Sequence, residues 1–295
     1  MSVETTAVAP RLDRASWTSR EESHAARVDA ATAAHRERRA RGEAHPVEDF
    51  LFTYYGTTPA QLRRWHPGPG VRLDGAATLD RAAWKHYRVV DGAVELDVAA
   101  FVAARGRALD FVRRLLSATV SRPARLGCFG LHEWAMVYRA DDGDVRHDRV
   151  PLRLGRAGTD QVVERQRITC SHFDAFRFFT PEAVSRNAIQ PTRESQVALE
   201  QPGCLHAGMD TYKWATKLTP LVPSELTMDC FDLASQIRRL DMEASPYDLS
   251  AWGVEPVRIE TAAGRTAYVE RQRAFAERSN ALRQRLLEVL DTAVG

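Results

Sequence analysis

The sequence predicts a mainly helical protein of the α+β class: a single helical domain with a small antiparallel β element around residues 145–170. Apolar residues recur every three or four positions over 97–120, 224–243 and 264–294, which is typical of helices that bury one face. The segment 161–169 alternates apolar and polar residues, so we expect strands there. Helices are therefore expected to carry most of the core.

The N-terminal segment 1–43 is expected to be a polar arm, partly disordered, and residues 44–295 a single catalytic domain. Val28 is the lone aliphatic residue of the stretch 21–41, which is otherwise rich in charge and alanine. This composition favours a solvated helix over an arm that binds nucleic acid. No low-complexity linker follows residue 44, so we expect one domain rather than two.

Shorter elements are predicted from residues that begin or end them. Pro46 and the acids after it favour a short helix that ends at Gly56. The segments 86–90 and 93–96 have the composition of short strands. The segment 131–138 is apolar enough for either a buried strand or a short helix, and its length does not decide between them.

Composition limits the classes of function open to the chain. The net charge of +2 does not by itself indicate a polyanionic partner. No stretch approaches the roughly 20 apolar residues of a membrane span, and no signal peptide is present, so we expect a cytoplasmic protein without a membrane partner. No two cysteines have C-x-x-C spacing, which argues against a zinc ribbon or a thioredoxin-like site. The cysteines are Cys128, Cys170, Cys204 and Cys230.

A helix is predicted after Pro202 and Gly203, and it places four titratable residues on one face. They are His206, Asp210, Lys213 and Lys217. Offsets of 4, 7 and 11 fall within about 60° of one another on a helix. Two interpretations stay open. The face is either a solvated row of ion pairs or one wall of an active site.

Three short motifs each combine a histidine with a nearby carboxylate: His132-Glu133, His172-x-Asp174 and His206-x-x-x-Asp210. Large aromatic residues flank all three. A buried carboxylate costs several kcal/mol unless it is paired, so carboxylates in aromatic surroundings favour one shared polar pocket. We expect the third motif to face the first two. The alternative is three unrelated polar pairs.

One chemistry that these motifs allow is a metal site. Two histidines and a carboxylate are the ligands of non-haem iron enzymes. The candidate ligands for one divalent metal of the iron type are His132, His172, Asp174 and His206. The partner in this case is a small-molecule substrate.

A second chemistry is base excision, which needs no cofactor. It requires a carboxylate that stabilises an oxocarbenium-like sugar and an aromatic slot for a flipped base. The candidate catalytic residues are Asp174, Asp210, Glu133 and Lys213, the last either to hold a phosphate or as an amine nucleophile. The candidate substrate-binding residues are His132, Trp134, His172, Phe173, His206, Trp214, Tyr54 and Tyr55. The partner is damaged DNA, held by a basic rim of Arg177, Arg186, Arg193 and Lys217.

Residues 45–290 also resemble a family. The stretches that carry the likeness are HPVEDFLFTYY, CFGLHEWAMVYR, ITCSHFDAFRFFTP, EQPGCLHAGMDTYKWATKL and SPYDL with IETAAGRTAYVERQR. They are similar to actinobacterial proteins labelled 3-methyladenine DNA glycosylase. The resemblance implies a DNA-repair hydrolase that acts on N-glycosyl bonds and removes an alkylated purine such as 3-methyladenine. The chain has no glycine-rich hairpin of the helix-hairpin-helix class, so the candidate residues rest on their chemistry alone.

Overall fold

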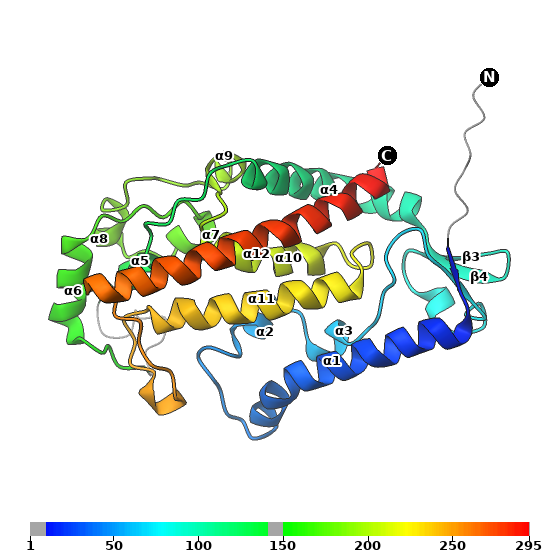
Figure 1. Ribbon diagram of the computed structural model, residues 1–295, viewed down its shortest axis with the longest axis horizontal. Coiled ribbons are helices and arrows are strands. Elements are labelled where there is room, and N and C mark those ends of the chain that lie inside the picture. Colours follow the sequence, from blue (N-terminus) through cyan, green and yellow to red (C-terminus); the bar gives the residue numbers. More distant parts are fainter. Residues whose placement is uncertain (1–9, 141–149, 295) are drawn as a thin grey trace.

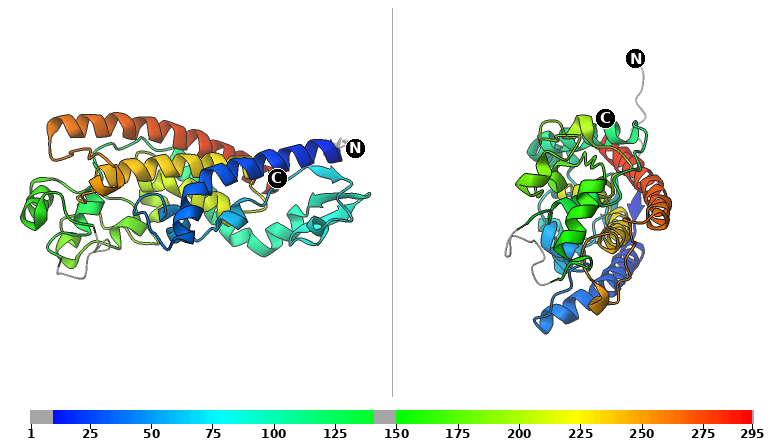
Figure 2. Two further views of the ribbon diagram at one scale, coloured as in Figure 1. Left: turned by 90° about the horizontal axis from the view of Figure 1, so that it is seen from below. Right: turned by 90° about the vertical axis from the view of Figure 1, so that its left-hand side faces the viewer.

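The structure is a computed structural model that describes residues 10–140 and 150–294. Over these residues the chain is 58% helical, with 12 helices and a small sheet of four strands. The predicted class, mainly α with a small β element, is confirmed. The long helices run lengthwise through the molecule, and the sheet lies at one end (Figures 1 and 2). No helix in the described ranges is long and apolar enough to cross a membrane.

The helices are α1 Arg14–Ala40, α2 Phe50–Tyr54, α3 Pro59–Leu62, α4 Val98–Val120, α5 Leu131–Ala135, α6 Gly155–Arg165, α7 Phe173–Phe176, α8 Pro181–Val184, α9 Gln196–Leu199, α10 Leu205–Lys217, α11 Ser224–Glu243 and α12 Ala262–Val294. The strands are β1 Arg11–Leu12, β2 Arg72–Asp74, β3 Tyr87–Val90 and β4 Ala93–Leu96. The three long helices that the apolar periodicity predicted are α4, α11 and α12. The segment that the sequence left open, 131–138, begins with the short helix α5.

The sheet has the order β1-β2-β4-β3, with β1 parallel to β2 and the other two pairs antiparallel. β3 and β4 are strands that the sequence predicted. The expected position of the β element at 145–170 was wrong. Gly155–Arg165 is the helix α6, whose buried residues Thr159, Val162 and Val163 share one helical face. Over so few residues, the apolar pattern fits the two-residue repeat of a strand as well as the 3.6-residue repeat of a helix. Packing against the core favours the helix. Residues 145–149 lie outside the described ranges.

The segment predicted as a polar arm contains α1, which packs on the rest of the chain. Trp17 and Val28 belong to the same buried cluster as the long helices. The Trp17 Nε1 donates to the carbonyl of Asp74 at 2.9 Å. Arg27 pairs with Asp229 and Asp232 on α11 at 2.9 and 2.6 Å. Trp17, Val28 and ion pairs therefore dock a helix that lacks a broad apolar stripe. Residues 1–9 lie outside the described ranges.

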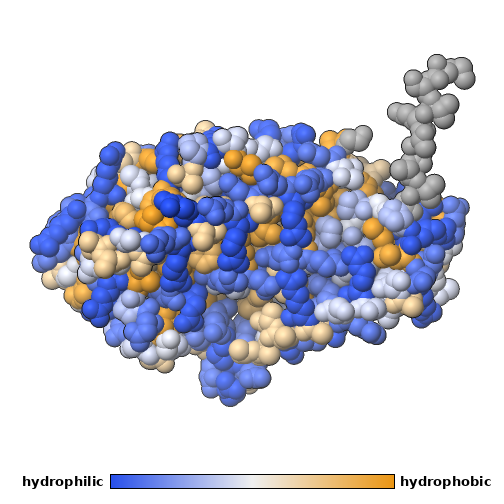
Figure 3. Space-filling view, viewed as in Figure 1, coloured by the Kyte–Doolittle hydropathy of each residue, from blue (hydrophilic) through white to orange (hydrophobic). Residues whose placement is uncertain are grey.

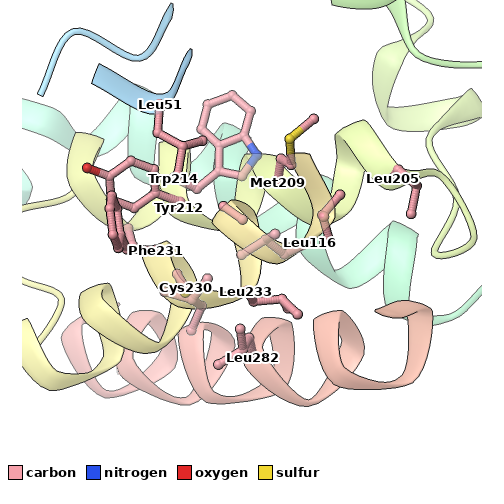
Figure 4. Close-up of a cluster of buried hydrophobic side chains, with 14 of the residues drawn as sticks. Leu51, Leu116, Leu205, Met209, Tyr212, Trp214, Cys230, Phe231, Leu233 and Leu282 are labelled. Carbon is pink, nitrogen blue, oxygen red and sulfur yellow. The ribbon is translucent and has the colours of Figure 1, made fainter. Parts of the chain in front are cut away.

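The core is built around α10, which packs against α11 and α12. Ten of its 13 residues are buried. Apolar side chains from these three helices and from α2 and α4 surround it (Figure 4). Gly208 permits the close approach, because an added Cβ there would lie 2.8 Å from both Ile237 Cδ1 and Ser279 Oγ. Polar residues of α10 are therefore enclosed by the core, whereas the face shown in Figure 3 is hydrophilic with small hydrophobic areas.

Candidate functional site

The buried face of α10 carries three of the four titratable residues that the sequence aligned. His206 and Asp210 are buried, and the Lys213 side chain is only 12% exposed. Lys217, at the end of the helix, is exposed, with its Nζ 5.6 Å from the centre of the Trp214 ring. The solvated row of ion pairs is therefore not formed. The Asp210–Lys213 pair exists, but the core encloses it.

Lys213 lies between two buried carboxylates. Its Nζ donates to Asp174 Oδ2 and to Asp210 Oδ2, each at 2.8 Å. Tyr55 donates to Asp210 Oδ1 at 3.0 Å, and Arg193 donates to Asp174 Oδ1 at 2.6 Å. We call these five residues the Lys213 cluster. They come from α7, α10, the residue that follows α2 and the loop before α9.

The charges in the Lys213 cluster stabilise one another. Burial acts to raise the pKa of Asp210, but Lys213 and then His172 outweigh it and hold that pKa well below its usual value. Burial acts to lower the pKa of Lys213, but the two carboxylates raise it above its usual value. Lys213 is therefore a protonated counter-ion. The amine nucleophile predicted from the sequence requires the opposite pKa shift.

A second buried group of charges lies where α5, α10 and α11 meet. His132 Nε2 lies 2.9 Å from Asp241 Oδ1. Arg238 Nη1 donates to Glu133 Oε1 at 3.0 Å and to Asp241 Oδ2 at 2.9 Å. The rings of His132 and His206 meet edge to face with their centroids 4.3 Å apart. We call these five residues the His132 cluster.

Four members of the His132 cluster form a group that can ligate a metal ion. One donor atom from each of them lies within 4.8 Å of the donor atoms of the other three. All four side chains are buried: His132, Glu133, His206 and Asp241. Two imidazoles and two carboxylates form a donor set that binds zinc, iron or manganese.

The protonation states in the His132 cluster differ between its two histidines. Burial acts to lower the pKa of His132, but the Asp241 carboxylate outweighs it and raises that pKa. Burial and the neighbouring His132 lower the pKa of His206 well below its usual value, so this imidazole is neutral. Within the described chain, His206 has ring contacts but no hydrogen-bond partner. Its nitrogens are therefore available as ligands.

His172 connects the two clusters. Its ring stacks on that of His206 with centroids 5.4 Å apart. Its Nε2 lies 3.4 Å from Asp210 Oδ2 and 3.8 Å from Glu200 Oε2. Both carboxylates lie close to this ring, but neither ring nitrogen makes a well-aligned hydrogen bond within the described residues. Burial raises the pKa of Glu200, and nearby Asp210 raises it further.

A small cavity separates the clusters. Its polar wall consists of Glu133, Asp174, His206 and Arg238, and its other wall is mostly aromatic. The aromatic and apolar lining residues are Phe50, Tyr54, Met136 and Phe178. The volume of about 10 Å³ accommodates one water-sized molecule.

The structure brings together all three histidine–carboxylate motifs, but it excludes several predicted substrate-binding residues from the cavity. Trp134 is fully buried, and its Nε1 donates to the carbonyl of Ala244 at 2.8 Å. Trp214 packs against Phe111 with ring centroids 5.8 Å apart. Phe173 lies under Arg193, whose Cζ is 4.7 Å from the ring centre. These rings therefore do not form a slot around the cavity.

The predicted basic rim is largely neutralised by acids. Arg193 and Arg177 both lie against Asp174, at 2.6 and 3.4 Å. Arg186 lies 3.9 Å from Glu164. Of the four predicted residues, Lys217 alone has no acidic partner in the described part of the chain.

Sequence reasoning did not identify Arg238 and Asp241. A signal was present on α11. Thr227, Phe231 and Ala234 lie at helical spacing on a buried stripe, and Arg238 and Asp241 continue it at offsets of 11 and 14 from Thr227. Charged residues that extend an apolar stripe must find partners inside the core. The pattern on α11 therefore predicts that Arg238 and Asp241 are buried and paired, although it does not say which residues of other elements they contact.

Comparisons of the chain with family models, with curated proteins and with solved structures give no match. A function for this chain must therefore be inferred from the geometry of the site.

Proposed function

We propose that this chain is a metal-dependent enzyme of the non-haem iron type that acts on a small molecule. One divalent metal would be held by His132, His206, Glu133 and Asp241. The observation that carries the proposal is the convergence of these four buried side chains, whose donor atoms lie within 4.8 Å of one another. Two of them, His132 and His206, were candidate ligands from the sequence.

The surroundings of these residues support a metal site. His206 is a neutral imidazole, which is the form that binds metals. Arg238 donates to both carboxylates and orients them, as second-layer groups do in known metal sites. The other two ligands predicted from the sequence are less well placed. Asp174 is bound by Lys213 and Arg193, and His172 faces Asp210.

The proposed roles of the remaining residues follow from their positions. When bound, the metal would supply Lewis-acid or oxygen-binding chemistry at the cavity. Phe50, Met136 and Phe178 exclude bulk water from the cavity, which strengthens electrostatic interactions there. Lys213 holds a positive charge beside Asp174, one of the lining residues, and can stabilise negative charge that develops in the cavity.

Elemental analysis of the purified full chain tests this proposal. We expect one equivalent of a transition metal per chain, or one equivalent taken up by metal-free protein from added iron(II) or cobalt(II). Cobalt(II) bound by imidazole and carboxylate would give visible absorption bands. Protein that neither retains metal nor acquires these bands at millimolar cobalt would refute the proposal.

The pH dependence of metal binding gives a separate prediction. Asp241 raises the pKa of His132, so a metal must displace a proton from this ring. Affinity is expected to increase as pH rises through about 6.5 and above, with release of one proton per ion. Cobalt titrations over this range, with proton release followed by a dye, measure the effect. Binding that is independent of pH would contradict the assignment of His132.

The same pKa shifts set the pH range in which the metal-free pair stabilises the fold. The pKa of His132 is raised, so its contribution is full below about 6.5 and is lost as pH rises through the raised pKa. The pKa of Asp241 is lowered, so its contribution is full above about 3.9 and is lost as pH falls. Metal-free protein should therefore gain most from this pair at mildly acid pH.

The N-glycosylase hypothesis, with damaged DNA as partner, rests on the family resemblance and remains a prediction. The site favours it less than the metal centre. The cavity beside Asp174 accommodates about one water-sized molecule, whereas a flipped purine needs a slot of its own size. Both aspartates that would serve as the catalytic carboxylate are bound by Lys213.

A further inference from the structure

A groove lies away from the buried clusters, near the end of α10. It consists of two adjoining pockets of about 290 Å³ each, which share Arg64, His66 and Thr219. We call it the Arg64 groove. Thr216, on its wall, is ten residues beyond His206, or about 15 Å along the helix axis. The groove is therefore separate from the proposed metal centre.

One pocket of the Arg64 groove is basic. Three cations line it, Arg64, Lys85 and Arg105, and none of its described lining residues is acidic. Arg64 lies over the Trp84 ring at 4.9 Å. Arg105 donates to the backbone carbonyl of Lys217 at 2.9 Å. None of the three cations forms an ion pair with an acid in the described ranges.

The lack of counter-ions distinguishes this pocket from the nearby surface. Arg63 pairs with Asp29 at 3.1 Å, and Arg88 pairs with Glu95 at 2.6 Å. Three cations around a concave surface without acids create a positive potential that attracts an anion. Charge-assisted hydrogen bonds from arginine and lysine suit a phosphate group.

The second pocket of the Arg64 groove is rich in hydroxyl groups. Its polar lining includes Thr57, Gln61, Thr216, Thr219 and Thr227. The Thr216 hydroxyl donates to backbone carbonyls of its own helix, at 3.1 Å to Tyr212 and 3.0 Å to Lys213. A hydroxyl that donates in this way still has lone pairs that accept hydrogen bonds. This pocket therefore suits a ligand that carries hydroxyl groups.

Two histidines complete the groove. Burial and the nearby Arg81 and Arg64 lower the pKa of His66 to about 3, so it is neutral and offers hydrogen bonding rather than charge. His86 has a left-handed backbone, with φ at 66°. Such conformations cost free energy in residues other than glycine, and they concentrate at binding sites.

We propose that the Arg64 groove binds a small phosphorylated ligand with several hydroxyl groups, a sugar phosphate or a nucleoside monophosphate. The phosphate would lie among Arg64, Lys85 and Arg105, and the sugar hydroxyls against the threonines of the second pocket. Pockets of this size are typical of small-molecule sites. The proposal does not depend on the metal centre.

Isothermal titration calorimetry on the full chain tests the proposal with four ligands: ribose 5-phosphate, adenosine monophosphate, ribose and inorganic phosphate. Both phosphorylated sugars or one of them should bind, and their relative affinities distinguish a sugar phosphate from a nucleotide. Ribose should not bind measurably, and inorganic phosphate should bind more weakly than the sugar esters. Affinity should fall as salt rises, because the cations are exposed.

Matched variants make the test specific. Lys85→Gln and Arg64→Gln should each weaken binding by roughly tenfold or more, since each loses a charge-assisted hydrogen bond. Arg63→Gln, which removes a neighbouring charge that already has an acidic partner, should leave affinity unchanged. Arg64→Gln removes both a charge and the contact with Trp84. Lys85 forms no hydrogen bond or ion pair with other described side chains, so Lys85→Gln removes a charge alone. Weaker binding by Lys85→Gln would therefore show that the loss of charge matters.

Four outcomes would overturn the proposal. The first is that neither ester binds, and the second is that Lys85→Gln binds as tightly as the unchanged chain. The third is that inorganic phosphate binds as tightly as the esters, which would leave the hydroxyl-rich pocket without a role. The fourth is that a single-stranded oligonucleotide binds more tightly than the esters and displaces them, which would make the surface a nucleic-acid groove.

Discussion

Replacement of His206 with alanine is expected to abolish metal binding and leave the chain folded. His206 is a neutral imidazole on the cavity wall, and no hydrogen bond to another described residue depends on it. Loss of a direct ligand should weaken metal binding by more than the roughly 10–100-fold that accompanies loss of a second-layer partner. The free energy of unfolding should fall by no more than about 3 kcal/mol, the upper end of ordinary substitutions. Cobalt titration and urea unfolding of the same preparation measure both effects.

A matched control separates loss of a ligand from general damage. His24 is also buried, and its Nε2 bonds to the carbonyl of Leu62 at 2.9 Å, far from the site in the α1–α3 contact. His24→Ala should lower stability without changing the metal stoichiometry. If His206→Ala retains a full equivalent of metal at unchanged affinity, the His132 cluster is a structural ion-pair network and the proposed function is wrong.

Replacement of Lys213 with methionine is expected to destabilise the fold by about 3 kcal/mol or more near neutral pH. The change removes the one ammonium that pairs with both Asp174 and Asp210. Asp174 keeps Arg193, but Asp210 keeps only the Tyr55 hydroxyl and His172 beside it. A buried carboxylate that loses its counter-ion costs more than an exposed one, because the core does not solvate it.

The pH dependence of this loss has a definite sign. In the unchanged chain, the pKa of Asp210 is lowered, so its contribution to stability is present above about pH 4 and is lost as pH falls. The pKa of Lys213 is raised, so its contribution is present below about pH 10. The difference between Lys213→Met and the unchanged chain should therefore shrink in acid.

Lys217→Met is the matched control, since it makes the same chemical change one helical turn further on. Lys217 is exposed and lies over Trp214 rather than beside an acid. Its replacement should change stability by about 0.5 kcal/mol or less. Adding Asp210→Asn to Lys213→Met should recover part of the loss. Equal stability of the two lysine variants in urea unfolding would show that solvent already screens the Lys213 pairs.

The long helices could be predicted because each one carries its own signal. In α4, α11 and α12 the apolar residues repeat over many turns, so the buried face is set by local spacing. The segment 161–169 has too few residues for that signal, and its alternation predicted a strand, although its first five residues belong to the helix α6. The composition of the N-terminal segment did not predict that α1 packs on the core, because Trp17 and a few ion pairs hold this helix in place.

The candidate site was likewise predicted only in part from the sequence. The sequence by itself determined which side chains of α10 share a face, and it associated that face with His132 and His172. Helical spacing and the high cost of an unpaired buried carboxylate are sufficient for that inference.

Only the tertiary structure decided which partners those side chains meet. Asp241 reaches His132 across a separation of 109 residues, and Lys213 reaches Asp174 across 39. Such pairings depend on how helices cross, which local spacing does not encode. The packing of α5 and α11 against α10 therefore assigns His206 to the proposed metal centre and Lys213 to its neighbouring carboxylates.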